Sequence, residues 1–293
     1  MKRVDYVPIN ARPALSLPEG ARLAVYCLVA VEEWPLDAPI PRAALTPPAG
    51  GPGPVPDVPN WAWHEYGMRV GFWRLKAVLD RHGVRATVAL NASVCRSYPP
   101  IVEAALAAGW ELMGHGLIQK AMSRVEDERA TIRETIRLIR DASGKAPRGW
   151  VGPGLIETWE TADLLAEEGI EYCLDWVLDD QPVELRVRSG RRLVAIPYTL
   201  EVNDSPLFMV QHHPPQEFLR RATEQFDTLY AEGRESARVM AMGVHPFLMG
   251  VPHRIRYLDQ ALEHMRRQAG VLFWTGSEIL DWYLASSTSR DTP

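Results

Sequence analysis

Two glutamates and two histidines follow apolar runs that are typical of buried strands, and these residue types at strand ends can catalyse hydrolysis. Glu32 and Glu33 end the run ARLAVYCLVAV, His115 follows WELMG, and His245 follows MAMGV. Burial raises the pKa of a carboxyl toward that of a general base near neutral pH, and an imidazole exchanges protons in that range. We therefore predict Glu32, Glu33, His115 and His245 as catalytic residues. The alternatives are an exposed strand end for the glutamates and a core position for each histidine.

The surroundings of these residues refine the prediction. Successive strand residues point to opposite faces, so only one of the two glutamates needs to face the site. Gly114 and Gly116 flank His115 and would leave room for a closely approaching substrate. The remaining histidines, among them His64, lie in predicted helices or loops, and most of them are expected in solvent.

Apolar runs of strand length alternate with amphipathic segments of helix length along the chain. The predicted strands cover residues 21–34, 84–93, 110–116, 148–153, 170–180, 193–200 and 237–246. This alternation predicts parallel strands joined by right-handed crossovers. Asn91, Asp175 and Asp180 also lie at or near predicted strand ends, at the rim where barrels of this type build their active sites.

A Pro/Gly-rich segment over residues 37–60 interrupts the pattern. We predict a long irregular loop near the site; a domain linker is the alternative, although too few residues precede it to form a domain. Trp61, Trp63 and Trp150 lie around this loop and a later turn. Aromatic side chains suit the wall of a site for a flat, uncharged ring, and packing of the loop over the core would explain them equally well.

Bulk properties limit the partners and the location. With 293 residues and 46% hydrophobic content, the chain can bury the core of one barrel-sized domain or of two. A net charge of −5 argues against nucleic acid or an anionic membrane as partner. We expect a small-molecule substrate and a homo-oligomer. The absence of an apolar leader and of a run near the ~18 residues of a membrane span predicts a cytoplasmic protein. Cys27 and Cys173 lie in apolar runs and are predicted to be buried free thiols.

Taken in order, these motifs resemble those of the polysaccharide deacetylase family, also known as NodB-like proteins or carbohydrate esterase family 4. That family carries an Asp-Asp pair after its first strand, at the position of Glu32 and Glu33 here. It also carries the pattern Glu-x-x-x-His-x-x-x-His. Glu111 and His115 match this pattern, while Gln119 replaces the second histidine.

The resemblance covers about residues 20–285. The arginine and proline that surround a turn in the family resemble RGWVGP at residues 148–153, and the family's last strand-end histidine matches His245. The Glu-Glu pair, the missing second histidine, and the segments NWAWHEYGMRVGFWRL, CLDWVLDDQP and PYTLEVND resemble the allantoinase-like branch. That branch acts on cyclic amides and ureides, and its representatives are described as metal-independent.

The resemblance implies one catalytic domain over residues 1–293. It implies an α/β fold, a deformed (β/α) barrel of about seven parallel strands, with the site at the C-terminal rim. Zinc in the parent family needs one carboxylate and two histidines together with water. Because Gln119 is a poor, neutral oxygen donor, only Glu33 and His115 would remain as ligands. We therefore expect no cofactor; zinc, if it bound, would be held by those two residues.

This pattern favours hydrolysis of a non-peptide carbon–nitrogen bond, in a cyclic amide, imide or ureide. Glu32 would be the general base, and Glu33 would orient the water or hold a substrate N–H. His115 and His245 would stabilise the oxyanion and protonate the leaving nitrogen. The predicted substrate-binding residues are Trp61, Trp63, Tyr66, Arg69, Asn91, Trp150, Asp175, Asp180 and Asn203. The alternatives are an N-deacetylase of a small sugar or glycan precursor, and an inactive barrel that binds a metabolite.

Overall fold

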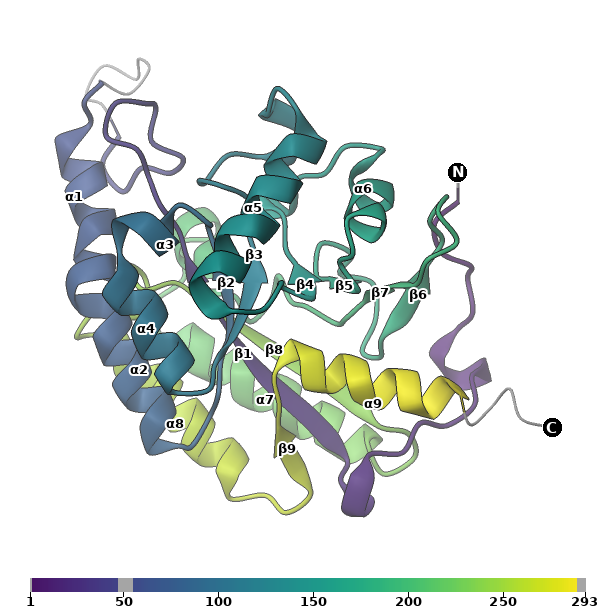
Figure 1. The fold of residues 1–293 in the computed structure, drawn as a ribbon. Coiled ribbons are helices and arrows are strands. Elements are labelled where there is room, and N and C mark those ends of the chain that lie inside the picture. Colours follow the sequence, from purple (N-terminus) through teal and green to yellow (C-terminus); the bar gives the residue numbers. More distant parts are fainter. Residues whose placement is uncertain (1, 47–54, 289–293) are drawn as a thin grey trace.

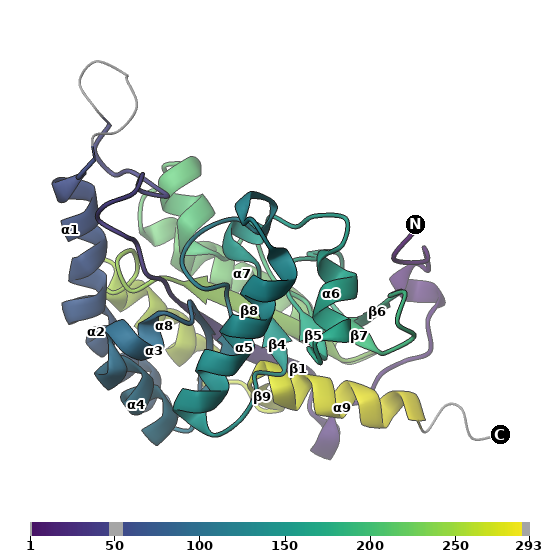
Figure 2. The same ribbon diagram turned by 45° about the horizontal axis from the view of Figure 1, so that its top comes forward.

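The computed structural model describes residues 2–46 and 55–288. The strands in this part of the chain are β1 (Leu23–Val31), β2 (Thr87–Leu90), β3 (Glu111–Gly114), β4 (Gly149–Trp150), β5 (Tyr172–Cys173), β6 (Val183–Leu185), β7 (Leu193–Ala195), β8 (Arg238–Val244) and β9 (Val271–Phe273). Their order in the sheet is β6-β7-β5-β4-β3-β2-β1-β8, and β9 pairs with β1. The sheet curls into a partial barrel with helices on its outside (Figure 1, Figure 2). The predicted α/β fold of deformed barrel type is therefore confirmed.

Helices connect the strands and cover the outer face of the sheet (Figure 2). They are α1 (Val58–Tyr66), α2 (Phe72–Arg81), α3 (Val94–Ser97), α4 (Pro99–Ala107), α5 (Glu128–Ser143), α6 (Thr161–Glu167), α7 (Gln216–Glu232), α8 (Ile255–Arg266) and α9 (Gly276–Thr288). A π-helical segment, Gly67–Gly71, joins α1 to α2, and another, Pro206–Val210, precedes α7. Within the described residues, no helix combines the length and the apolar character that crossing a membrane requires.

Strand β1 lies next to β8, the last strand in the sheet order, and all nine of its side chains are buried. Strand β8 pairs with one side of β1, while β9 and β2 share the other side. Alternate side chains enter two different core clusters, with Val25 and Cys27 in one and Tyr26 and Leu28 in the other. This burial on both faces explains the unbroken apolar run in the sequence. Cys27 and Cys173 are buried free thiols, as predicted.

The strands differ from the sequence prediction in the second half of the sheet. The strand predicted over residues 170–180 ends at Cys173, where β5 stops. The chain then continues without regular structure to β6, which pairs antiparallel to β7 and was not predicted. Residues 174–180 therefore do not continue the strand. The acidic residues at the end of this segment consequently do not lie at a strand end, where they were predicted.

The described part of the predicted loop is held in place by one buried amide. The Asn60 Oδ1 atom accepts the backbone N–H groups of Ala44 (2.8 Å) and Leu45 (2.9 Å). Helix α1 begins at Val58, inside the segment predicted as loop, because Asp57 caps it by accepting the Asn60 N–H. Residues 47–54 of the predicted loop lie outside the described residues.

Candidate active site

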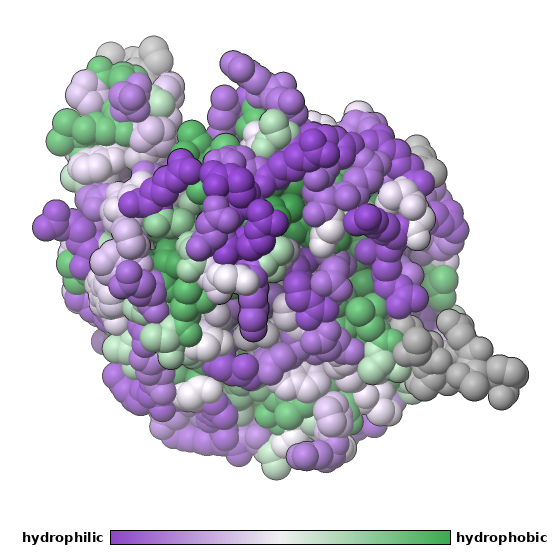
Figure 3. All heavy atoms as spheres, viewed as in Figure 1, coloured by the Kyte–Doolittle hydropathy of each residue, from purple (hydrophilic) through white to green (hydrophobic). Residues whose placement is uncertain are grey.

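Three predicted catalytic side chains meet at the carboxyl edge of the sheet. Glu32 directly follows β1, His115 follows β3, and His245 follows β8, so the parallel arrangement places all three at one edge. The Glu32 Oε1 atom lies 3.4 Å from Nε2 of His245 and 3.9 Å from Nε2 of His115. Glu32 and His115 are each 5% exposed, and His245 is 8% exposed. Figure 3 shows the surface hollowed at this edge, between the lobe of α1 and the tip of α5.

His245 is held between two carboxylates. Its Nδ1 lies 2.6 Å from Oδ1 of Asp204, and its backbone N–H donates to Oδ2 of the same carboxylate at 2.8 Å. Burial opposes a charge on the ring, but Asp204 and Glu32 outweigh burial and raise the pKa of His245 to about 10. His245 is therefore an imidazolium at neutral pH. Asp204, which is fully buried, was missed from the sequence, where its neighbour Asn203 was chosen instead.

The orientation of His115 is fixed from behind. Its Nδ1 lies 2.6 Å from the carbonyl oxygen of Val151. A carbonyl only accepts hydrogen bonds, so Nδ1 carries the proton and Nε2 faces Glu32. The sequence suggested that the flanking glycines leave room for a substrate. The structure contradicts this. A Cβ on Gly114 would lie 2.6 Å from the Trp150 ring, and Gly116 has a φ of +71°, which favours glycine.

The electrostatics of Glu32 differ from the prediction. Burial alone would raise the pKa of its carboxyl, as we expected from the sequence. The imidazoles of His115 and His245 outweigh this effect and hold the pKa of Glu32 well below its ordinary range. Glu32 is therefore ionised at neutral pH, paired with the cationic His245.

An aromatic wall borders this cluster on one side. Trp34 donates its Nε1–H to Oε2 of Glu32 at 2.7 Å. The His64 ring stacks on Trp34 with centroids 4.3 Å apart, and Phe247 packs on both rings at 5.1 Å. The prediction that most of the other histidines lie in solvent is wrong for His64, which is 2% exposed. Its burial lowers the pKa of His64 to about 4, so this ring is neutral at neutral pH.

Two predicted tryptophans contribute to this wall, whereas two predicted neighbours do not contact it. Trp63 packs edge-on against Phe247 at 5.0 Å, and Trp61 donates its Nε1–H to the Trp34 carbonyl at 2.9 Å. The hydroxyl of Tyr66 instead contacts the Arg74 guanidinium at 3.2 Å. Arg69 lies exposed on the π-helical segment that follows α1.

Two predicted substrate-binding residues do not line an open site. Trp150 is fully buried in the core, so it cannot wall a site that admits substrate. The carbonyl of Asp180 accepts the N–H of Val239, the second residue of β8, whereas His245 follows the other end of that strand. Six residues of strand separate these positions by roughly 20 Å. Asp180 therefore lies at the opposite rim, because the segment after β5 turns back along the sheet.

Asn91 and Asn203 support the backbone around the site. Asn91 Oδ1 accepts the N–H of Glu33 at 2.9 Å, and its Nδ2 donates to the His115 carbonyl and, at 3.4 Å, to Gln119 Oε1. Asn203 donates to the Tyr198 hydroxyl and accepts the Ser205 N–H, each at 3.0 Å. Both amides were predicted to bind substrate, and both are engaged within the protein instead.

Glu33 points away from the histidines. Its Oε1 accepts the Ser97 hydroxyl at 2.7 Å, and in the part of the chain that the structure describes no ion pair joins it to a histidine. The carboxylate beside His115 is Glu32, so the expected zinc pair of Glu33 and His115 is not formed. The side-chain alternation at the end of β1 separates the two glutamates.

The donor set does not fit a metal ion of the parent family. Among the described residues, no group of three or more His, Cys, Asp or Glu side chains is arranged to hold one. The position of the second histidine carries Gln119, whose oxygen faces the Asn91 amide. Metal-independent activity remains a prediction.

Asp175, also predicted to bind substrate, lies beside the backbone behind His115. Its Oδ1 accepts the N–H of Gly152 at 2.8 Å, and its Oδ2 is buried without a hydrogen-bond partner among the described residues. Burial raises its pKa well above the ordinary range of a carboxyl.

Sequence comparison gives consistent relatives. The family model described as polysaccharide deacetylase matches residues 64–173. A "Putative polysaccharide deacetylase" of Schizosaccharomyces pombe is 30% identical, with 73% of each chain covered. A "Peptidoglycan deacetylase" of Helicobacter pylori is 26% identical and covers 73% of this chain and 84% of its own length.

Solved structures extend the similarity over almost the whole chain. The crystal structure of "Puue Allantoinase" superimposes with a TM-score of 0.85 at 25% identity, covering 97% of this chain and 99% of that one. A "probable Polysaccharide deacetylase" from Pseudomonas aeruginosa PAO1 has a TM-score of 0.84 at 26% identity, covering 97% and 96%. The chain is thus similar in sequence and fold to proteins that are described by two different activities, deacetylase and allantoinase.

Proposed function

Because this chain belongs to the polysaccharide deacetylase family of hydrolytic enzymes, we propose that it hydrolyses a carbon–nitrogen bond in a small cyclic amide, imide or ureide. The observation that carries the proposal is the arrangement of Glu32, His115 and His245 beside an aromatic wall, with no group suited to a metal among the described residues. The similarity to an allantoinase structure over 97% of the chain supports the choice of ring substrate.

The attacking water would be held by Glu32 and His115. When the His115 ring is neutral, its Nε2 and Oε1 of Glu32, which lie 3.9 Å apart, both accept hydrogen bonds, so one water can donate to each of them. Its lone pair then faces the substrate carbonyl carbon. As the new C–O bond forms, a proton passes from the water to Glu32.

His245 would supply the proton that the leaving nitrogen needs. The imidazolium first stabilises the negative charge that develops on the carbonyl oxygen, and its Nε2–H then protonates the nitrogen as the C–N bond breaks. When His245 loses its charge, Glu32 loses its cationic partner and holds the proton that it took from water more tightly, so that proton is not returned to the tetrahedral intermediate. Transfer of the proton from Glu32 to His245 restores both groups.

The aromatic wall would select a flat, uncharged substrate. Trp63, the partly exposed member of this group, offers an apolar surface, and the buried Trp34 and Phe247 pack behind it. The neutral ring of His64 adds a hydrogen-bonding group without adding charge, which suits the C=O and N–H edges of a cyclic amide.

N-deacetylation of a small sugar is the second candidate function, because both sequence relatives are described as deacetylases. The same cluster can hydrolyse an acetamide, with acetate and an amine as products. The two functions differ in the shape of the group that fits against the aromatic wall.

The test compares substrates on protein treated with chelator. We expect ring opening of allantoin, a hydantoin or succinimide, unaffected by chelator and lost in Glu32→Gln. Acetate release from an N-acetyl sugar that requires added metal would overturn the cyclic-amide proposal in favour of the deacetylase. Binding of these compounds without turnover would instead favour an inactive metabolite-binding barrel.

A further inference from the structure

Two half-buried acidic residues, each with one fully buried carboxyl oxygen, lie behind the candidate site, one after β5 and one before α6. Asp175 Oδ2 and Glu157 Oε1 are both buried without a hydrogen-bond partner among the described residues, and the two side chains interact with each other. Two carboxylates in a dry environment repel each other, so one of them retains a proton. A proton between Asp175 and Glu157 would give each oxygen the partner that it lacks.

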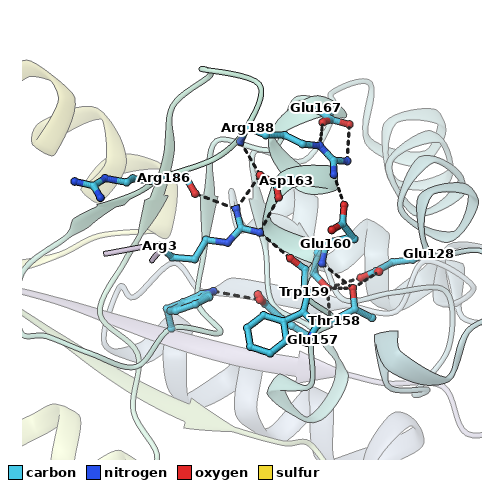
Figure 4. Close-up of polar contacts among 12 residues, drawn as sticks. Arg3, Glu128, Glu157, Thr158, Trp159, Glu160, Asp163, Glu167, Arg186 and Arg188 are labelled. Atoms are coloured by element: carbon cyan, nitrogen blue, oxygen red, sulfur yellow. Dashed lines mark hydrogen bonds and ion pairs between the residues drawn. The ribbon is translucent and has the colours of Figure 1, made fainter. Parts of the chain in front are cut away.

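The outer oxygens of this pair are held by separate donors. Asp175 Oδ1 accepts the Gly152 N–H at 2.8 Å, and a Cβ on Gly152 would lie only 3.1 Å from that oxygen. Glu157 Oε2 accepts the Trp176 Nε1–H at 3.2 Å. Figure 4 shows Glu157 beside the ion pair between Arg3 and Asp163.

Charged and titratable groups surround the pair on several elements. Arg3, from the N-terminal segment, lowers the pKa of Glu157, whereas Glu128, at the start of α5, raises it. Burial raises the pKa of the Cys173 thiol and of the Tyr198 hydroxyl, and the charge of Asp175 raises both further. The two carboxyls therefore interact with one cation, Arg3, with one further carboxylate, Glu128, and with the thiol of Cys173 and the hydroxyl of Tyr198.

A single peptide group connects this pair to His115. The carbonyl of Val151 accepts the Nδ1–H of His115 at 2.6 Å, and the N–H of the same peptide, on Gly152, donates to Asp175 at 2.8 Å. The peptide is planar, so the two hydrogen bonds lie on opposite sides of one rigid unit. An anion on the N–H side polarises the peptide and makes the carbonyl a stronger acceptor.

We propose that Asp175 and Glu157 form a proton-sharing carboxyl pair that positions His115 through the Val151–Gly152 peptide. Burial raises the pKa of Glu157 to about 7 and that of Asp175 as well, so the pair keeps at least one proton at neutral pH. Loss of the shared proton at higher pH adds a negative charge on the N–H side of this peptide and strengthens the hydrogen bond that His115 Nδ1–H donates to the Val151 carbonyl. Both acids are positioning residues. Their effect on turnover rests on the proposed hydrolysis, whereas the shared proton is a property of the protein alone.

The first test needs no substrate. Infrared spectra of the whole protein, recorded from about pH 5 to about pH 9, should show a protonated carboxylic acid that is still present at about pH 7 and is lost as the pH rises further. Glu157→Gln should remove this transition, and Glu160→Gln, at an exposed neighbour paired with Arg188, should keep it. A wild-type spectrum with no protonated carboxyl above about pH 6 would overturn the proposal.

The second test asks whether the pair acts on His115. Nitrogen-15 spectra of histidine-labelled protein should show Nδ1–H on His115, and both Asp175→Asn and Glu157→Gln should shift the resonance of this group. The same variants should lower kcat/KM by about tenfold and flatten its dependence on pH near neutrality, as partners behind a functional histidine do. An unchanged His115 Nδ1–H resonance in both variants would refute the coupling. These spectra decide the matter even if no cyclic amide is a substrate.

Discussion

The two ends of strand β3 carry buried polar clusters that differ in how far their hydrogen-bonding capacity is used. At the start of the strand, each carboxylate oxygen of Glu111 accepts two hydrogen bonds. Tyr172 (2.8 Å) and the Ser277 hydroxyl donate to Oε1, and Thr87 (3.1 Å) and the Ser277 N–H (3.0 Å) donate to Oε2. This carboxylate joins the sheet to the first turn of α9, and nothing in it is left for chemistry.

The cluster just past the other end of β3 is less saturated. Glu32 accepts one short hydrogen bond from Trp34, while its second oxygen has only longer contacts with His115 and His245. The comparison indicates that a filled carboxylate stabilises the fold and that a partly filled one can accept a proton from water. The Glu-x-x-x-His pattern spans both clusters, so its two ends serve different purposes here.

The largest expected effect is at Glu32. Glu32→Gln keeps the shape of the side chain and removes its basicity, so kcat/KM should fall by about 10²- to 10⁴-fold. The melting temperature should change little, because the Gln side chain can still accept from Trp34. Steady-state kinetics and thermal melts on one preparation check both parts, and full turnover by the folded variant would remove Glu32 from the mechanism.

The next effect is at Asp204, which supports the charge on His245. Asp204→Asn should lower turnover by about a hundredfold, since a neutral amide neither stabilises the imidazolium nor fixes its tautomer. In the wild type the proton donor is lost only as pH rises through the His245 pKa of about 10. The alkaline limb of the kcat profile should move to lower pH in the variant. An unshifted limb would mean that His245 is not the proton donor.

Glu111 provides the contrasting test of the fully bonded cluster. Glu111→Gln leaves donors without their anionic acceptor, so the free energy of unfolding should fall by about 3 kcal/mol. Turnover per folded molecule should stay near the wild-type value. Denaturant unfolding with activity normalised to the folded fraction measures both. A large kinetic defect with unchanged stability would reverse the assignment of the two ends.

The convergence of the three catalytic candidates was predictable because parallel strands end at a common edge. Glu32, His115 and His245 each follow an apolar run, and the topology brings the ends of those runs together. Asp180 was misplaced because the apolar pattern before it resembles a strand that, in the structure, ends at Cys173. A sequence pattern does not show where the chain leaves the sheet.

The missed residues depend on contacts between distant segments. Asp204 is 41 positions from the histidine that it supports, and an Asn-Asp pair in a loop gives no sign of that partner. Trp34 and Phe247 were missed because they join the site only by packing on His64. These three residues come from segments that the tertiary fold brings together. Trp150 resembled a wall residue from its position near a turn, yet a two-residue strand places it in the core.

His64 sharpens the comparison through the dependence of stability on pH. Its folded pKa of about 4 lies below the ordinary value of 6.5, so the folded state resists protonation. Stability is then full above the ordinary value and is lost as pH falls from there toward the folded pKa. The loss should reach about 2 kcal/mol by about pH 5. His64→Phe keeps the stack on Trp34 and should remove this part of the acid sensitivity. Denaturant unfolding of the wild type and the variant above pH 6.5 and at about pH 5 measures this loss of stability. An equally steep loss in His64→Phe would contradict the prediction.

The smallest expected effect is at Glu33. Its carboxylate accepts the Ser97 hydroxyl at 2.7 Å and points away from the histidines, so Glu33→Gln should change kcat/KM by less than about threefold. Ser97→Ala removes the same hydrogen bond from the other side and serves as the matched variant. If Glu33 only holds the C-terminal end of α3, the two variants should behave alike in kcat, KM and melting temperature. If Glu33 holds a substrate N–H, as the sequence suggested, Glu33→Gln alone should raise KM while Ser97→Ala leaves it unchanged. Adjacent glutamates with a large effect at the first and a small effect at the second would show that side-chain alternation at the end of β1 separates their roles.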